Sequence, residues 1–402
     1  MILAFFLEKI SIYALIPFLT LLQATIFACI FIVRGQREER YSDFWLAGLV
    51  LLKGLTGVPY MLGWLGIDYL WEQLTFYPWD GLGLALPPVI YFFLQSLTNS
   101  DWRFQWRKEG KFFIPYLLYF VYHFAVGVQG KDFAHWWWAQ IDGGWYIGKG
   151  FEVLEIIMEG LCFWLTYRLY KEYEVWIKNY FSDLEKVNYK WFRNFLVVLA
   201  ANVLSGYVMS AYLAFFPPAQ ETWYQSLWWG YLTTTILTYY ISIEGLLQTR
   251  VHRVYFEQPD TILFSFVAPT LEKSEKQGLS EDLLPYKEKI TLLFKKEKIY
   301  LNPELSLSDL AQRLKTNTSI LSQVINNGFG KNFNDFVNEF RVNAVKLKIQ
   351  DAEHQHLSLL GIAFESGFNS KATFNRAFKK LTGSTPNDFA KNKNTTSPQT
   401  QN

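Results

Sequence analysis

The chain has few of the residues from which disulfide-rich, metal-binding or catalytic sites are built. It contains two cysteines in 402 residues, Cys29 and Cys162, and both lie in apolar runs, which excludes a disulfide framework and a cysteine metal cluster. The sequence also lacks a phosphate-binding glycine loop, a nucleophile elbow and a pair of catalytic acids. His354 and His356 have no further ligands nearby, which favours a solvated connector over a metal site. We therefore expect no enzyme, no metal and no cofactor.

A near-neutral net charge of +2 hides two parts of opposite sign. From Tyr286 onward there are 17 Lys and Arg against 10 Asp and Glu, whereas the preceding region has 21 against 26. All 16 tryptophans lie before residue 230, in a region of long apolar runs rather than alternating strands. This division predicts a membrane domain followed by a basic domain with a polyanionic partner.

Seven apolar runs, each near the roughly 20 residues that cross a bilayer as a helix, predict a transmembrane domain over residues 1–247. A secretory signal peptide is not expected, because Met1 to Glu8 has no basic segment. The predicted spans are Ile10–Val33, Phe44–Ile67, Trp79–Leu97, Phe112–Val128, Phe151–Tyr170, Phe192–Phe215 and Ser226–Leu247.

The distribution of basic residues predicts the orientation of these spans, since Lys and Arg favour cytoplasmic loops. The segments after spans one, three, five and seven hold fifteen Lys and Arg, whereas the other side holds Lys9, Lys131 and Lys149. The N-terminus is thus expected outside the membrane and everything after Leu247 inside. The external segment Gln129–Gly150, rich in tryptophan, is either part of an interfacial aromatic belt or a ligand-facing surface.

Several ionisable residues fall within the predicted spans, where a charge at the bilayer centre costs about 2.5–3.5 kcal/mol. Glu152, Glu155 and Glu159 are spaced by three and four and so share one helix face. One hypothesis pairs Lys53 with Glu155 or Glu159. The alternative is that these residues lie near the interfaces or line a small polar cavity.

Residues 248–285 are a predicted linker, after which helical periodicity resumes. Ser306 and Asp309 have the spacing of a helix start, and Asn317 is the expected N-cap of a second short helix, Thr318–Asn327. Two short helices joined by a tight turn form a helix-turn-helix. The outer face of the second helix carries polar side chains that can pair with base edges in a major groove: Thr318, Ser319, Ser322, Gln323 and Asn326.

A longer amphipathic helix, Phe333–Ile349, is followed by a second copy of this architecture. The residues that make the copy specific are Ile362-Ala363, Gly367-Phe368, Phe374, Arg376, Phe378-Lys379-Lys380, Gly383, Thr385-Pro386 and Phe389. At this spacing they resemble the signature of the AraC family of transcription regulators, and the resemblance covers roughly residues 286–391. It implies two helix-turn-helix motifs bridged by a long helix, with promoter binding as the activity.

The resemblance also implies recognition helices at Thr318–Asn327 and Ser370–Lys380. Two positions depart from the family pattern. Lys315 stands where a turn glycine is usual, so that turn either avoids a left-handed conformation or tolerates strain. Gly361 stands where an acidic residue is common, which weakens the start of that helix. The candidates for DNA contact in the second motif are Asn369, Ser370, Lys371, Thr373, Asn375, Arg376 and Lys379.

The two parts together favour an all-α, multi-pass regulator of the bacterial cytoplasmic membrane, with a cytoplasmic DNA-binding domain and a disordered tail at residues 392–402. Expected partners are double-stranded DNA, the lipid bilayer and an unknown signal or ligand; RNA polymerase and a second copy of the chain are further candidates. Span seven and the linker are expected to carry the signal. The alternatives are a transporter or channel with a regulatory or scaffolding tail, and a regulator released by proteolysis.

Overall fold

The computed structural model describes residues 12–65, 81–99, 101–129, 132–133, 136–137, 147–184, 189–216, 223–247, 280–354 and 356–396. Over these ranges the chain is helical and contains no β-strand, which confirms the all-α prediction. It divides into two compact units. Unit 1 comprises Met1–Lys171 and Trp191–Glu257, and unit 2 comprises Glu172–Lys190 and Gln258–Asn402. Most of the predicted linker and of the external segment after Gln129 lies outside the described residues.

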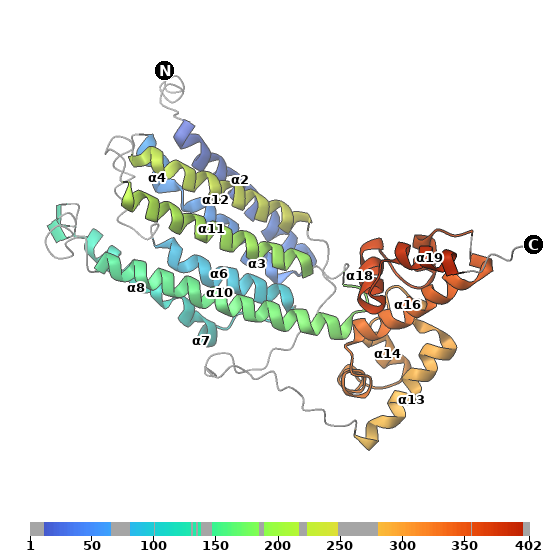
Figure 1. Cartoon of the computed structure of the whole chain (residues 1–402). Coiled ribbons are helices and arrows are strands. Elements are labelled where there is room, and N and C mark those ends of the chain that lie inside the picture. The colour runs from blue at the N-terminus through green and yellow to red at the C-terminus, as the bar shows by residue number, and fades with distance from the viewer. Residues whose placement is uncertain are drawn as a thin grey trace, which may run out of the picture. The chain divides into compact units, whose positions relative to one another are not determined.

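Unit 1 is a bundle of long helices that run side by side (Figure 1). The described part of each predicted span is helical, and the second span holds two helices, α3 and α4. The helices are α2 (Ile12–Glu38), α3 (Tyr41–Leu55), α4 (Val58–Trp64), α6 (Leu82–Thr98), α7 (Trp106–Glu109), α8 (Ile114–Gly127), α10 (Ile147–Tyr180), α11 (Tyr189–Phe215) and α12 (Trp223–Leu247).

Three stretches of unit 1 are long and apolar enough to cross a membrane by length and composition: Ala14–Glu38, Tyr41–Trp64 and Phe192–Phe215. Leu82–Thr98 is apolar but shorter. The other predicted spans do not meet the same combination of length, hydropathy and low charge in the described residues. Seven spans therefore stay a prediction, and three candidate spans are the finding.

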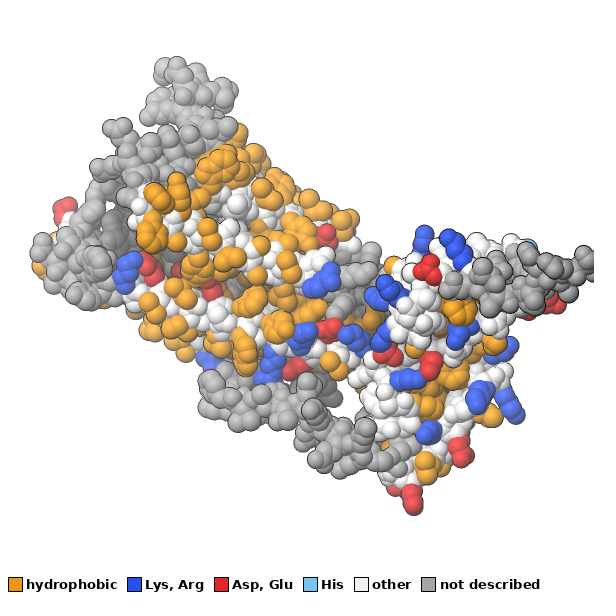
Figure 2. Space-filling model, in the orientation of Figure 1, with side chains coloured by type: hydrophobic (Ala, Val, Ile, Leu, Met, Phe, Trp, Pro, Cys, Tyr) orange, Lys and Arg blue, Asp and Glu red, His pale blue; other side chains and the backbone are white. Residues whose placement is uncertain are grey.

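Large apolar side chains of unit 1 face outward as well as inward. On α11, Val197, Leu204 and Val208 are between 61% and 64% exposed, although the helix has a mean hydropathy of 1.7. Figure 2 shows hydrophobic side chains over most of the visible face of this bundle. A contiguous apolar surface of this kind is uncommon on a water-soluble monomer and marks a membrane or partner interface.

Buried polar contacts hold three helices of unit 1 together at one end. Asp43 on α3 is 1% exposed and accepts two hydrogen bonds from the Arg34 guanidinium of α2, at 2.6 and 2.9 Å. Arg34 also donates to the carbonyl oxygens of Gly245 and Leu246, which lie at the C-terminal end of α12. A cation at this position satisfies terminal carbonyls and interacts favourably with the helix dipole. Arg34 directly follows the first predicted span and is one of the fifteen basic residues from which the orientation was predicted.

Unit 2 contains two helix-turn-helix motifs joined by a long helix, as the sequence predicts. Its elements are η3 (Glu281–Leu283), α13 (Leu284–Leu292), η4 (Leu293–Glu297), η5 (Ile299–Leu301), α14 (Leu307–Arg313), α15 (Thr318–Gln323), η6 (Val324–Gly328), α16 (Phe333–Gln350), η7 (Ala352–His354), α17 (Leu359–Glu365), α18 (Lys371–Thr382) and α19 (Pro386–Thr396). Helix α13 thus begins within the predicted linker, and α19 extends into the segment predicted as a disordered tail.

The predicted helix starts are confirmed by their capping hydrogen bonds. Ser306 and Asp309 form a reciprocal capping box at α14, and the Asn317 side chain accepts from the Ile320 amide at the start of α15. Ser358 accepts from the amide of Gly361, so α17 keeps an N-cap without the acidic residue that the family pattern favours. Polar caps fix these helices locally, whereas their packing comes from two apolar clusters.

Each motif packs on its own buried cluster. The first centres on Phe294, Leu310, Leu321 and Phe336, and the second on Val345, Ala363, Phe374 and Phe378. Helix α16 contributes to both clusters and so fixes the spacing between the motifs.

The turn of the first motif contains a residue in the left-handed conformation that is not glycine. Lys315 has a φ of 50°, so the turn tolerates strain rather than avoiding the left-handed region. In the second motif the corresponding role falls to glycine. Gly367 has a φ of 93°, and a Cβ there would overlap the Tyr300 carbonyl oxygen.

We predict that Gly367→Ala destabilises unit 2 far more than Gly383→Ala. Both glycines have positive φ, but no atom lies within 4 Å of a Cβ added at Gly383. Gly383→Ala should cost only the left-handed strain, about 1 kcal/mol. Gly367→Ala adds a clash with backbone and should cost about 3 kcal/mol or more.

The measurement is urea unfolding of the C-terminal fragment Gly278–Asn402. Equal losses in the two variants would show that the close approach around Gly367 is absent in solution.

Candidate nucleic-acid interface

The first recognition helix exposes part of the predicted polar face. On α15, Ser319 and Gln323 are exposed, whereas Leu321 is fully buried in the motif's core. Thr318, Ser322 and Asn326 are half-buried. The Asn326 amide donates to the Ser322 hydroxyl at 3.3 Å, so these two side chains support each other at the edge of the face.

The second recognition helix is strongly amphipathic. On α18 the buried residues Phe374, Ala377 and Phe378 face the core. The exposed residues Lys371, Asn375 and Lys379 recur every fourth position and share one face, with Arg376 beside them. Three cations and an amide on one exposed helix face suit contacts with phosphates and base edges.

Three predicted contact residues of this motif make contacts within the domain. Thr373 is 2% exposed, so its side chain is not available on the outer face of α18. The Ser370 hydroxyl caps α18 by accepting from the Thr373 amide, at 3.1 Å. The Asn369 amide donates to Asp183 at 2.9 Å and to the Pro303 carbonyl at 3.2 Å. The spacing of apolar residues along α18 does not distinguish contacts with DNA from contacts within the domain, because Thr373 lies in the first turn, where caps form.

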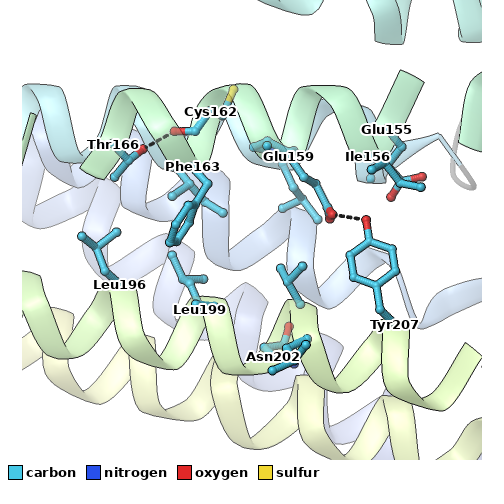
Figure 3. A pocket seen from close by; sticks show the side chains of 18 of the residues that line it. Glu155, Ile156, Glu159, Cys162, Phe163, Thr166, Leu196, Leu199, Asn202 and Tyr207 are labelled. Carbon is cyan, nitrogen blue, oxygen red and sulfur yellow. Dashed lines mark hydrogen bonds between the residues drawn. The ribbon is translucent and has the colours of Figure 1, made fainter. Parts of the chain in front are cut away.

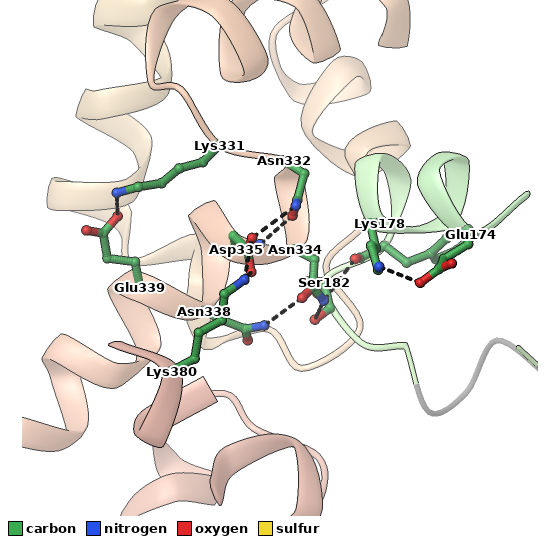
Figure 4. Close-up of polar contacts among 11 residues, drawn as sticks. Glu174, Lys178, Ser182, Lys331, Asn332, Asn334, Asp335, Asn338, Glu339 and Lys380 are labelled. Atoms are coloured by element: carbon green, nitrogen blue, oxygen red, sulfur yellow. Dashed lines mark hydrogen bonds and ion pairs between the residues drawn. The ribbon is translucent and has the colours of Figure 1, made fainter. Parts of the chain in front are cut away.

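Lys380, one position beyond the predicted contact residues, fastens α18 to the bridging helix. Its ammonium group lies 2.7 and 2.8 Å from the two carboxylate oxygens of Asp335 on α16 (Figure 4). Asp335 in turn accepts from the side chain of Asn332, which caps α16. The orientation of the second recognition helix is thus tied to the start of α16.

A segment far away in the sequence is part of unit 2. We call Phe181–Asp183, which directly follows α10, the docking segment. Ser182 is 1% exposed and donates to the Leu305 carbonyl, while the Asn334 amide donates to the Ser182 carbonyl at 2.8 Å (Figure 4). Asp183 accepts from Asn369.

The docking segment also meets the largest fully buried side chain of the described chain, Arg341 of α16. The guanidinium is 1% exposed and donates to the carbonyls of Tyr300 and Asn302, at 2.9 and 2.8 Å. It further donates to the Ser182 hydroxyl at 3.2 Å. Burial lowers the pKa of Arg341 to about 10, against the opposing effect of the Asp183 carboxylate. The group therefore stays charged at neutral pH.

Sequence reasoning assigned residues 172–190 to a cytoplasmic loop of the membrane domain. In the structure these residues cluster with the C-terminal domain, and their place in a cytoplasmic loop stays a prediction. The prediction of a cytoplasmic loop depends on the positive charges of this segment, Lys178 among them. One available signal was the unusual length of the helical pattern that ends at Tyr180.

In unit 1, the three residues of the hypothesis that pairs a lysine with one of two glutamates line one cavity. Lys53, Glu155 and Glu159 come together from α3 and α10. The charges of both carboxylates act on the Lys53 ammonium group, and Glu159 accepts a hydrogen bond from the Tyr207 hydroxyl at 2.6 Å. The pairing of Lys53 with Glu155 or Glu159 stays a prediction, and the structure places all three residues around one mostly apolar cavity. The described residues contain no group of three or more His, Cys, Asp or Glu arranged to hold a metal ion.

Comparisons with known proteins agree with the geometry of unit 2. Residues 310–392 match a family model described as a helix-turn-helix domain. An uncharacterised HTH-type transcriptional regulator of Staphylococcus aureus (strain COL) is 32% identical over 91 residues, which are 23% of this chain and 12% of that protein. The uncharacterised HTH-type transcriptional regulator YtdP of Bacillus subtilis (strain 168) is 29% identical over 90 residues, 22% of this chain and 11% of YtdP.

Among solved structures, a protein of unknown function from Listeria innocua matches at 29% identity with a TM-score of 0.23, over 26% of this chain and 94% of that one. The matches to the two curated regulators cover about an eighth of their length or less. The C-terminal domain of this chain is therefore a helix-turn-helix domain similar to those of proteins named transcriptional regulators, and such a domain implies DNA as its partner.

We predict separable effects of two substitutions on DNA binding. Gln323→Ala removes an exposed amide suited to a base edge and should reduce discrimination between DNA sequences by about 1–3 kcal/mol. Lys379→Ala should weaken binding to all sequences and lower the salt dependence by roughly one released ion.

Binding would be titrated at several salt concentrations with DNA selected from a random library and with scrambled DNA. Lys296→Ala is the matched control, since Lys296 is exposed on η4 and outside both recognition helices. A loss at Lys296 as large as that at Lys379 would contradict the assignment of the interface.

We also predict that the docking segment stabilises the DNA-binding domain. Fusing Glu172–Lys190 through a flexible linker to the fragment Gly278–Asn402 should raise its free energy of unfolding by about 2 kcal/mol, because Arg341 and Asn334 regain buried acceptors. Ser182→Ala in the fusion should remove part of this gain.

Lys178→Ala is the control, since Lys178 pairs with Glu174 at 2.7 Å and both residues belong to the fused stretch but not to the docking segment. Urea unfolding measures all four proteins. Equal stability of the fragment with and without the segment would rule out docking.

Proposed function

We propose that the chain is a membrane-embedded, sequence-specific DNA-binding transcription regulator, in which unit 1 senses a signal and controls promoter binding by unit 2. The observation that carries the proposal is a double helix-turn-helix domain with an exposed basic recognition helix, α18, in the same chain as a bundle with an outward apolar surface. The relatives' names support the regulatory role, and the excess of Lys and Arg after Tyr286 supports an anionic partner.

Membrane embedding in a bacterial cytoplasmic membrane is supported by the three candidate spans and by the exposed apolar side chains of α11. The asymmetry of Lys and Arg favours a cytoplasmic location for the C-terminal domain, where DNA is accessible.

For the path of the signal, α10 is a better candidate than span seven and the linker. The helix has 34 residues, about 50 Å at 1.5 Å per residue, against a hydrocarbon core of about 30 Å. It contributes residues to both units and leads directly into the docking segment. A displacement of α10 would therefore act on Ser182 and Asp183, which bind residues of both motifs.

A transporter or channel with a regulatory tail is the second candidate. The cavity with Lys53, Glu155 and Glu159 favours it, because charged groups inside a membrane bundle often mark a substrate path. Uptake of a substrate that persists after the recognition helices are inactivated would support this candidate.

The regulator proposal predicts that the intact chain occupies discrete promoters while it stays in the membrane fraction. Genome-wide DNA occupancy and a C-terminal immunoblot of membrane and soluble fractions would measure both. Replacing Lys371, Arg376 and Lys379 together by Ala should abolish occupancy without changing the membrane signal. Unchanged occupancy would refute DNA recognition by α18, and a shorter soluble species at the promoters would indicate proteolytic release instead of tethering.

A further inference from the structure

Unit 1 contains a cavity, open on one side, that the DNA-binding role leaves unexplained. Its volume is about 620 Å³, within the range of roughly 300–1,000 Å³ that small-molecule sites occupy. Side chains of α3, α6, α10 and α11 form its walls. Most of the wall is apolar, with Leu86, Ile90, Phe163, Leu196 and Leu204 among the lining residues.

The two carboxylates of the lining lie toward one end of the cavity. Figure 3 shows Glu155, Glu159 and Tyr207 at that end, and Phe163 and Leu196 toward the other. A site with a polar end and a long apolar remainder matches an amphipathic molecule, with a head group at the first and a hydrocarbon body in the second.

The formal charge of the polar end selects the head group. Among the lining residues there are two carboxyl groups, those of Glu155 and Glu159, and one amine, that of Lys53, so acidic side chains outnumber basic ones. In an apolar setting such an excess favours a bound cation and disfavours a carboxylate. The carboxylate of Glu155 is pressed close to α6 at Gly83, where an added Cβ would overlap it.

We propose that this cavity binds an amphipathic amine, with its ammonium group between Glu155 and Glu159 and its hydrocarbon chain along the apolar wall. The inference rests on the proposed function in that the amine would be the signal that unit 1 senses. Glu155 and Glu159 lie on α10, the helix that leads into the docking segment. An ammonium group bound there adds a charged contact to α10, the helix that contributes residues to both units.

The test is equilibrium binding to the full-length protein in nanodiscs of a neutral choline phospholipid. Decylamine, decanol and decanoate share one hydrocarbon chain and differ only in the head group. Decylamine should bind saturably and at least about tenfold more tightly than the other two, as expected for a hydrogen-bonded charge pair. Tighter binding of decanoate, or equal binding of all three, would overturn the proposal.

Substitutions locate the site. Glu159→Gln and Glu155→Gln keep the shape of the side chains and should each weaken decylamine binding about tenfold or more. Glu152→Gln is the matched control, because Glu152 lies on the same helix, outside the cavity, and pairs with Lys149 at 2.9 Å. Gly83→Ala, which would displace the Glu155 carboxylate, should also weaken binding. Unchanged affinity in Glu159→Gln and in Gly83→Ala, with both proteins folded by thermal unfolding, would exclude this cavity.

The source of the amine is resolved by the bilayer. Displacement of decylamine when an aminophospholipid is added to the nanodisc identifies a lipid head group, and undiminished binding identifies a free amine. Neither measurement involves DNA. Absence of promoter occupancy together with intact decylamine binding would count against the regulator alone. Promoter occupancy together with absence of decylamine binding would count against the cavity site alone.

Discussion

The buried guanidinium of Arg341 is the constraint on which the DNA-binding domain depends. It lies where α16, the turn at Tyr300 and Asn302, and the docking segment meet, and each of them supplies an acceptor, the one on α16 being Asn338. A buried cation is costly unless its donors are satisfied, so moving any one of these segments away raises the free energy of the domain. Gly367 belongs to the same arrangement, because a Cβ there would lie 3.1 Å from the Arg341 Nε atom. The contacts of Arg341 thus hold the docking segment and the turn at Tyr300 against α16, the helix that joins the two motifs.

The docking segment occupies a position from which both motifs are reached. Ser182 binds Leu305, which precedes the N-cap of α14, and Asp183 binds Asn369, which precedes the N-cap of α18. Residues just before an N-cap set the direction in which a helix starts. One short segment therefore bears on the first helix of the first motif and on the recognition helix of the second.

Local rules explain what the sequence could predict and long-range contacts explain what it could not. The caps at Ser306, Asn317 and Ser370 depend on residues three positions away, and the helices they start are where periodicity places them. The docking of Ser182 joins residues separated by more than 120 positions. Burial of Ser182 and Arg341 leaves no periodic pattern in the sequence. The predicted domain boundary at residue 247 therefore takes no account of their contact. The burial of Thr373 could not be read from the sequence either, because a polar residue in the first turn of a helix can belong to the cap or face the solvent.

The energies involved bear on how a signal would be transmitted under the proposed function. A ligand shifts an equilibrium only by its difference in affinity for the two states, and allosteric couplings typically amount to 1–3 kcal/mol. The hydrogen bonds of the docking segment to Arg341, Asn334 and Asn369 are of that order in sum, since each contributes about 0.5–1.5 kcal/mol, or more where a charge takes part. Breaking them would loosen the spacing between the motifs without unfolding either hydrophobic cluster, because Phe294 and Phe378 pack within their own motifs. A modest binding energy at α10 is therefore sufficient to alter promoter binding, provided that the ligand distinguishes the docked from the undocked state.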